Sequence, residues 1–203
     1  MNTMNNINLV ITGVGGQGTL LVTKILGEAG LKAGLNVTAS EIHGMAQRGG
    51  VVVTTVRFGN AKSPLIADGD ADILLGFEPV ETLREIKKSS PEKTTIITNI
   101  RPTQPFTVAM GAAEYPSVDE IMKKIEPCCR RLFTVDMEKM ADEIGIPVIA
   151  ANILMLGILA GTDVIPIPKE IIRQSITENV PPKFSEQNCN AFDVGYTFGR
   201  NNK

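Results

Sequence analysis

A strand, a glycine-rich turn and a helix open the chain in that order, and this constrains the fold more than any other feature. Residues 7–12 are mostly apolar on consecutive positions, as in a strand buried on both faces of a parallel sheet. Residues 19–32 carry apolar side chains at helical spacing. A second strand is expected at 37–41, so the first 41 residues should form a βαβ unit with a right-handed crossover.

The rest of the chain continues this alternation. Strands are expected at 51–58, 73–77, 94–99 and 131–135, and helices at 78–88, 117–125, 136–144, 151–160, 168–177 and 185–198. Residues 101–116 hold three prolines and should form an irregular connection or a short edge strand. We therefore expect an α/β fold, with a Rossmann-like, mostly parallel sheet, flanking helices and a helical C-terminal part. Residues 1–203 should form a single domain.

Composition excludes several classes of protein. The net charge is −2, no Lys/Arg run occurs and aromatic residues make up only 4%, which does not suit a nucleic-acid partner. The longest apolar stretch, 148–160, is too short to span a membrane, and no signal peptide precedes residue 7, so a cytoplasmic location is expected. Cys128, Cys129 and Cys189 include no C-x-x-C pair, so no metal site is expected.

The glycine turn is the first candidate binding site. Gly13, Gly15 and Gly18 match G-x-G-x-x-G: the first allows the tight turn, the second removes a Cβ, and the third lets helix and strand pack closely. Backbone N–H groups and the helix dipole then favour an anion. We expect Gly13, Gly15, Gly16, Gln17 and Gly18 to bind a phosphate-bearing ligand, while a purely structural turn remains the alternative.

A dinucleotide-binding enzyme is a further alternative. That interpretation needs an acidic residue about 20 residues further on, at the end of the second strand. Glu41 ends the expected strand, but it lies 23 residues after Gly18 and directly before an atypical loop. An NAD site is therefore possible but not favoured, and the P-loop pattern is absent from the sequence.

The segment 42–50, Ile-His-Gly-Met-Ala-Gln-Arg-Gly-Gly, is polar, rich in glycine and without periodicity, so we expect a loop. It should lie beside the glycine turn, at the carboxyl edge of the sheet. Arg48 is predicted to pair with a phosphate or carboxylate, or equally to form an interface salt bridge. His43 is the only histidine, and no nucleophile motif accompanies it, so a polar position near a subunit contact is preferred to catalysis.

Taken together, the two segments are more specific than either alone. Residues 13–18, followed by Glu41 and the loop leading into Val51-Val52-Val53, resemble the gamma-type subunits of 2-oxoacid:ferredoxin oxidoreductases. The H-G-M-A-Q-R-G-G form is similar to that of the small (beta) subunit in the indolepyruvate type. Later features of the chain agree with the resemblance, which covers nearly all of it: Glu78-Pro79, Asn152 with Gly157, and Asn190-Ala191-Phe192 with Gly195.

The resemblance implies a role in a complex that oxidatively decarboxylates a 2-oxoacid, joins the acyl group to coenzyme A and passes electrons to ferredoxin. It implies that thiamine diphosphate and iron–sulfur clusters belong to a large partner subunit. This chain should then hold no cofactor itself and be inactive alone, and coenzyme A, a substrate, should lie near the glycine turn. Indolepyruvate or another arylpyruvate is the first candidate substrate, with pyruvate, 2-oxoglutarate and branched-chain oxoacids left open.

Two other functions remain open at this stage. One is a stand-alone dinucleotide-binding oxidoreductase, and the other is a nucleotide-free assembly module in which the turn only packs against a partner. A subunit should present an apolar contact surface, for which Ile42, Met45, Phe192, Tyr196 and Phe198 are the candidates. The three aromatic residues lie at helical spacing, which is also typical of a core position.

Overall fold

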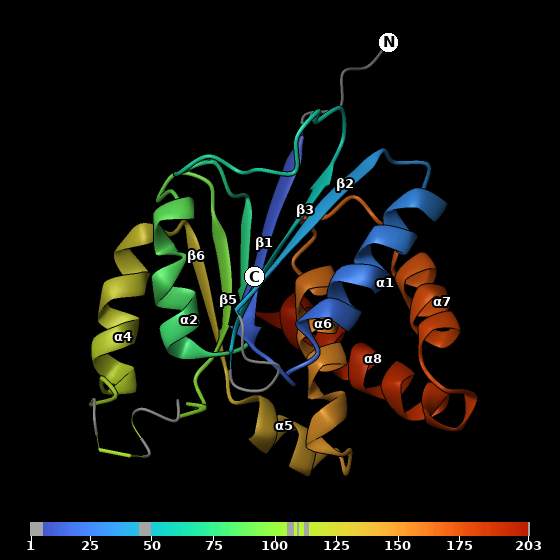
Figure 1. Ribbon diagram of the computed structural model, residues 1–203. Helices are drawn as coiled ribbons and strands as arrows, with labels where there is room; N and C mark the ends of the chain where they lie inside the picture. Colours follow the sequence, from blue (N-terminus) through green and yellow to red (C-terminus); the bar gives the residue numbers. More distant parts are fainter. Residues whose placement is uncertain (1–5, 45–49, 105–107, 109, 112–113, 203) are drawn as a thin grey trace.

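A six-stranded sheet runs through the computed structural model, which describes residues 6–44, 50–104, 108, 110–111 and 114–202. The strand order is β2-β3-β1-β4-β5-β6 (Figure 1). The strands are β1 (Ile7–Val14), β2 (Val37–His43), β3 (Val51–Phe58), β4 (Ile73–Gly76), β5 (Thr95–Asn99) and β6 (Arg131–Val135). All eight residues of β1 except Ile7 are buried, as expected for a central strand.

The sheet is mostly parallel, as predicted. β1, β4, β5 and β6 pair in parallel, while β3 pairs antiparallel with both β1 and β2. β1 and β2 therefore run in the same direction, but β3 lies between them. The first βαβ unit consequently spans a gap that a later strand fills, a feature the sequence did not indicate.

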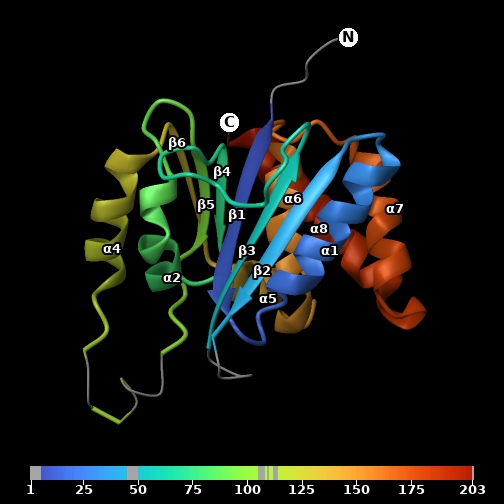
Figure 2. The same cartoon turned by 45° about the horizontal axis from the view of Figure 1, so that its top comes forward.

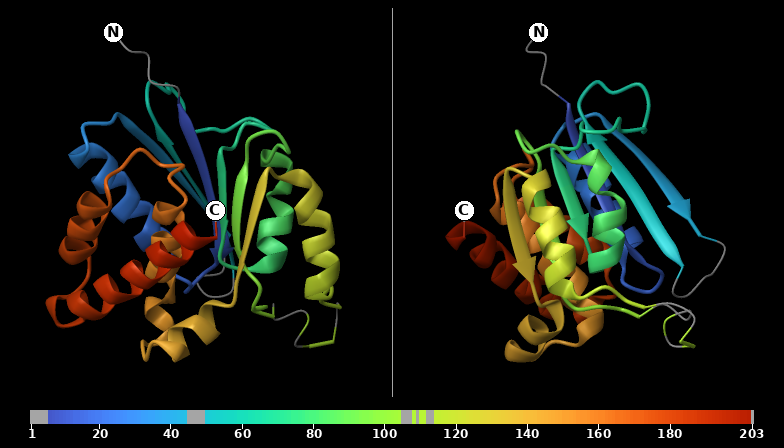
Figure 3. Two further views of the ribbon diagram at one scale, coloured as in Figure 1. Left: turned by 180° about the vertical axis from the view of Figure 1, so that it is seen from behind. Right: turned by 90° about the vertical axis from the view of Figure 1, so that its left-hand side faces the viewer.

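Helices cover the two faces of the sheet unequally. One face carries α1 (Thr19–Lys32), α6 (Ala151–Gly161), α7 (Lys169–Asn179) and α8 (Ser185–Asn201) (Figures 1 and 3). The other carries α2 (Pro79–Arg84) and α4 (Val118–Ile125), which lie over β4, β5 and β6 (Figure 2). The short α5 (Met137–Glu143) follows β6 at the carboxyl edge. On the α2 side, no helix of the described residues lies over β2 and β3 (Figure 2).

Local signals in the sequence account for several helix boundaries. The Ser117 hydroxyl caps α4 by accepting from the Glu120 N–H, and the Glu120 carboxylate accepts from the Ser117 N–H. This confirms the predicted capping box. Glu78 caps α2, whose first residue is Pro79. Every residue of α6 is buried, as its apolar composition predicts.

The C-terminal helices α6 and α8 meet backbone to backbone. Gly157 and Gly161 of α6 face Gly195 and Gly199 of α8, and a Cβ on any of the four would overlap a carbonyl oxygen of the opposite helix. Phe192 on the same stretch of α8 is fully buried, and Tyr196 and Phe198 pack against the main core. Phe192 is therefore a core residue and cannot form a contact surface, whereas Tyr196 and Phe198 are only partly buried, and a contact role for them stays a prediction.

Among the described residues, no single helix combines the length and apolar character needed to cross a membrane. The segments Met137–Glu143 and Val148–Gly161 reach that threshold only when taken together, and they are bent by 115° relative to each other.

Candidate functional site

The hairpin between β2 and β3 lies directly beside the glycine turn, as predicted. The Gly15 N–H donates to the Gly50 carbonyl at 2.8 Å, and the Gly44 N–H donates to the Val51 carbonyl at 2.8 Å. Ile42 and His43 continue β2, so the connecting loop is shorter than the expected 42–50. Arg48 belongs to residues 45–49, which lie outside the described residues, as does the side chain of His43.

The structural roles of Gly13 and Gly18 differ from those predicted for the first and third glycines of the turn. Gly13 lies inside β1 rather than in the turn, and a Cβ there would come within 2.7 Å of Gln17 Oε1. Gly16 and Gly18 have φ values of 104° and 79°, which L side chains rarely adopt. A Cβ on Gly18 would overlap the side-chain amide of Asn152, so this glycine allows α6, not a strand, to approach α1.

The Gln17 side chain is used to hold the turn in place. Its Oε1 accepts from the Val14 N–H at 2.9 Å, and its Nε2 donates to the Phe77 carbonyl and to Thr103 Oγ1, both at 3.2 Å. The amide therefore ties the turn to the ends of two neighbouring segments. Backbone N–H groups of the turn, rather than the Gln17 side chain, are therefore available to bind a ligand.

A cavity of about 340 Å³ adjoins the turn. It opens where β1 and β5 end and where α5 and the 3-10 turn at Val148–Ala150 begin. Its lining consists of Gly16, Gln17, Asn99, Thr103, Met137, Glu138, Val148 and Ile149. Val148 and Ile149 are 55% and 82% exposed, so one wall is an apolar surface open to solvent.

Three helices begin close to residues that line this cavity: α1, α5 and α6. Neither α1 nor α6 has a side-chain cap or an acidic residue in its first turn, so their first N–H groups are free of local carboxylates. In contrast, α5 is capped by Asp136 and carries Glu138. Arg101 Nε lies 3.3 Å from the Glu138 carboxylate and 3.9 Å from that of Asp136, so it offsets part of this negative charge.

Two buried carboxylates stand behind the cavity. Glu78 accepts hydrogen bonds from the Tyr115 hydroxyl, the Thr103 N–H and the Glu81 N–H, and so fixes Thr103 against Gln17. Burial and the hydrogen bond to Glu78 raise the pKa of Tyr115. Burial also raises the pKa of Glu81, against the opposing effect of Arg84. Glu81 Oε2 has no hydrogen-bond partner among the described residues.

Sequence analysis missed Asn99, Thr103 and Glu78 as parts of this site. Asn99 donates to the carbonyls of Phe77 and Arg101 and accepts from the Met137 N–H, so it joins three segments at the sheet edge. Asn99 is the last residue of β5, and Glu78 follows β4 by two positions. Polar residues at the carboxyl ends of parallel strands were the signal that could have identified both.

The geometry does not suit the dinucleotide alternative. In that fold the acidic residue ends the strand next to β1 and reaches the ribose beside the glycine turn. Here Glu41 lies on β2, paired with Thr54 of β3, and β3 separates it from β1. The extra strand moves Glu41 about 5 Å farther from the turn.

The side chains of the chain do not form a metal or cluster site within the described residues. Within the described residues, no three or more His, Cys, Asp or Glu side chains lie together as a metal ion would require. The three cysteines are free thiols, and burial raises the pKa of Cys129 to about 11, which disfavours the thiolate that binds metals.

Comparison with known proteins defines the class. Residues 8–198 match the family described as pyruvate ferredoxin/flavodoxin oxidoreductase, so the chain belongs to this family. The resemblance to the gamma-type subunits of 2-oxoacid:ferredoxin oxidoreductases is thereby confirmed. Among its relatives are the proteins named indolepyruvate oxidoreductase subunit IorB from Pyrococcus horikoshii, 44% identical, and Thermococcus kodakarensis, 43% identical. In both comparisons the alignment covers 95% of each chain.

Solved structures share the fold at lower identity. The gamma subunit of a keto/oxoacid ferredoxin oxidoreductase from Geobacter sulfurreducens superposes with a TM-score of 0.65 at 22% identity, over 95% of this chain and 98% of that one. The 2-oxoglutarate:ferredoxin oxidoreductase from Magnetococcus marinus, described with coenzyme A bound, gives 0.69 at 20% identity. The match covers 98% of this chain but 32% of that one, so there the fold is one part of a longer polypeptide.

Proposed function

We propose that this chain is the non-thiamine small subunit of an indolepyruvate-type 2-oxoacid:ferredoxin oxidoreductase. It supports coenzyme A-dependent oxidative decarboxylation in the cytoplasm and is inactive alone. The observation that carries the proposal is the 44% identity to an indolepyruvate oxidoreductase subunit over 95% of both chains. A large partner subunit supplies thiamine diphosphate, the iron–sulfur clusters and the route to ferredoxin.

Coenzyme A is proposed to meet this chain at the cavity beside the glycine turn. The uncapped N-terminus of α1 and the backbone N–H groups of Gly16 and Gly18 support an anionic ligand there. At about 340 Å³ the cavity is at the lower end of the usual range for small-molecule sites, roughly 300–1,000 Å³. It would hold the phosphate-bearing part, leaving the thiol to extend toward the partner's thiamine site.

Assembly gives the first test. The full chain is co-expressed with a large thiamine-bearing subunit from the same genome, and the complex is isolated and assayed with indolepyruvate, pyruvate, 2-oxoglutarate and branched-chain oxoacids. We expect a stable complex that reduces ferredoxin only when both chains and coenzyme A are present. A chain that stays free of any thiamine-bearing partner, or that turns over NAD(H) unaided, would overturn the proposal.

Introducing a charge of either sign at Ile149 tests the coenzyme A site, because this residue lines the cavity and is 82% exposed. In the assembled complex, Ile149→Glu should raise the KM for coenzyme A about fivefold, since a nearby like charge costs about 1 kcal/mol at a solvated site. Ile149→Lys should lower that KM or leave it unchanged. The KM for the 2-oxoacid should stay constant in both variants.

Leu31→Glu is the matched control, since Leu31 is 62% exposed in the last turn of α1, remote from the glycine turn. It should leave both KM values unchanged. If the Glu and Lys variants at position 149 shift the coenzyme A KM in the same direction, the ligand does not sense charge there and the site assignment fails.

A further inference from the structure

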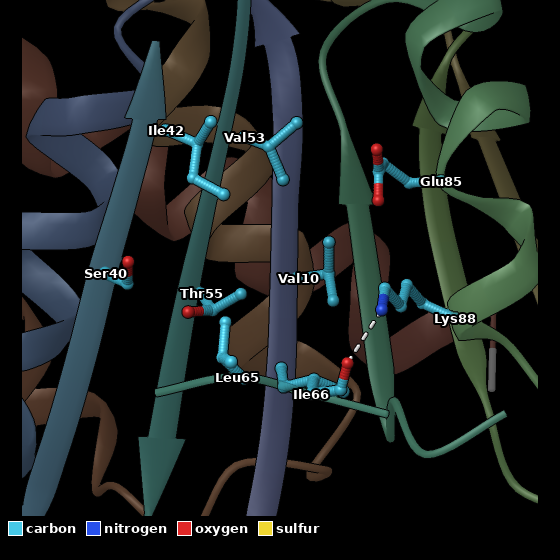
Figure 4. Close-up of a pocket in the computed structure, with 9 residues that line it drawn as sticks. All are labelled: Val10, Ser40, Ile42, Val53, Thr55, Leu65, Ile66, Glu85 and Lys88. Carbon is cyan, nitrogen blue, oxygen red and sulfur yellow. Dashed lines mark hydrogen bonds between the residues drawn. The ribbon is translucent and has the colours of Figure 1, made fainter. Parts of the chain in front are cut away.

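One half of the sheet has an uncovered face on its α2 side. The residues of β3 alternate between buried positions, which face α1, and partly exposed ones, which face away from it. Figure 4 shows Val53 and Thr55 of β3 on this outer side, beside Ile42 and Ser40 of β2 and Val10 of β1. Ile42 is 61% exposed, an unusual exposure for a large apolar side chain on a strand.

A recess of about 210 Å³ lies on this face. Segment 59–72 crosses its lower edge. Thr55 Oγ1 donates to the Pro64 carbonyl at 2.9 Å. Lys88 Nζ donates to the Ile66 carbonyl at 2.8 Å, as Figure 4 shows. Leu65 projects from that segment and is 70% exposed. The recess is therefore an apolar depression with one exposed apolar residue at each end, Ile42 above and Leu65 below.

Of the two charged side chains that line the recess, Lys88 has an ion-pair partner and Glu85, among the residues described, does not. Lys88 Nζ lies 2.9 Å from the Asp68 carboxylate and also bonds the Ile66 carbonyl, so its charge is already compensated. Glu85 lines the same recess, and within the described part of the chain its carboxylate has no hydrogen-bond or ion-pair partner. A complementary surface would bring one apolar side chain for the depression and one cation for Glu85.

We propose that this surface, formed by Ile42, Val53, Thr55, Leu65, Ile66 and Glu85, docks an apolar side chain flanked by a basic one from the large thiamine-bearing subunit. The inference rests on the proposed function and names the surface that would serve it. β2 and β3 continue from this face into the hairpin, whose end bonds to the glycine turn. One partner element lying along the hairpin would thus reach the cavity as well.

A second copy of this chain suits the surface less well. A two-fold contact would place the same patch opposite itself, so each Glu85 would face a patch whose lysine is already paired with Asp68. In the longer 2-oxoglutarate:ferredoxin oxidoreductase chain, the same fold is joined to a much larger remainder rather than standing alone. Both points favour a different, larger partner.

Photo-crosslinking in the assembled complex tests the docking surface. A benzoylphenylalanine residue replaces Ile42, Leu65, Ile149 or, as a negative control, Leu31, one position at a time. Crosslinks from positions 42 and 65 to the large subunit, and none from position 31, are the expected result. Ile42→Glu and Glu85→Lys should each weaken binding of the purified large subunit by about tenfold or more, and Leu31→Glu should not.

The outcomes separate this inference from the proposed function. If the wild-type chain binds the large subunit and position 149 crosslinks to it, but positions 42 and 65 do not, the docking surface is wrong and the proposed function stands. Crosslinks from positions 42 and 65 to a second copy of this chain would also overturn the inference. If the wild-type chain binds no large subunit, the proposed function itself fails and the inference fails with it.

Discussion

At the scale of single residues, Gly18 joins two helices that are far apart in the sequence. It ends the glycine turn with φ 79° and precedes α1, and its missing Cβ leaves room for the Asn152 amide at the start of α6. Gly18→Ala should therefore lower the free energy of unfolding by at least about 2 kcal/mol, from a strained backbone and an overpacked contact. Urea unfolding of the full chain measures this loss.

The two causes can be separated with Asn152→Ala. In that background the overlap disappears, and Gly18→Ala should cost only the left-handed backbone strain, about 1–2 kcal/mol. An equal cost in both backgrounds would show that Asn152 does not set the requirement for glycine.

Glu81 offers a prediction about pH. Burial raises the pKa of its carboxyl above the ordinary value near 4.5, so the folded chain holds this proton more tightly than the unfolded chain does. Above pH 4.5, stability is lost as the pH rises toward the raised pKa, because burial disfavours the charged form. Glu81→Gln removes this loss, so its stability relative to the wild type should improve as the pH rises above 4.5 and level off once the pH passes the raised pKa.

Denaturant unfolding at several pH values is the measurement. Glu85→Gln, one turn further on, controls for the removal of one carboxylate from the same segment. A difference between Glu81→Gln and wild type that stays flat or shrinks with rising pH would contradict the burial argument.

At the scale of elements, the contact between α6 and α8 depends on glycine at four positions. Gly157→Ala would place a Cβ onto the Phe192 carbonyl and should destabilise the chain by about 1–3 kcal/mol or more. Gly27→Ala is the opposite case, because Gly27 lies in α1 with open space around it, and it should stabilise by about 0.5–1 kcal/mol. Thermal unfolding of both variants checks the two signs together.

Most elements could be predicted from the sequence because their signals are local. The capping box at Ser117, the apolar run of α6 and the consecutive apolar residues of β1 each give the correct element. The aromatic residues of α8 could not be placed in the same way, because helical spacing alone does not say which face meets α6. That choice is made by the glycines on both helices.

At the scale of the whole molecule, the α/β class and the mostly parallel sheet were predictable, whereas the position of β3 was not. Apolar and β-branched residues at 51–58 indicate a strand but not its neighbours, since pairing depends on contacts distant in sequence. The site, too, could be predicted only in its local part. Gly16 and Gln17 do line the cavity, but Asn99, Thr103 and Glu138 reach it from other segments that only the fold brings together.

The backbone contact between α6 and α8 has a mechanical consequence. Side chains that interdigitate can exchange rotamers and let two helices slide, but main chains in direct contact have no such freedom. We therefore expect the two helices to move as one unit. Because α6 begins against Gly18, a displacement of the C-terminal helix should also move the glycine turn.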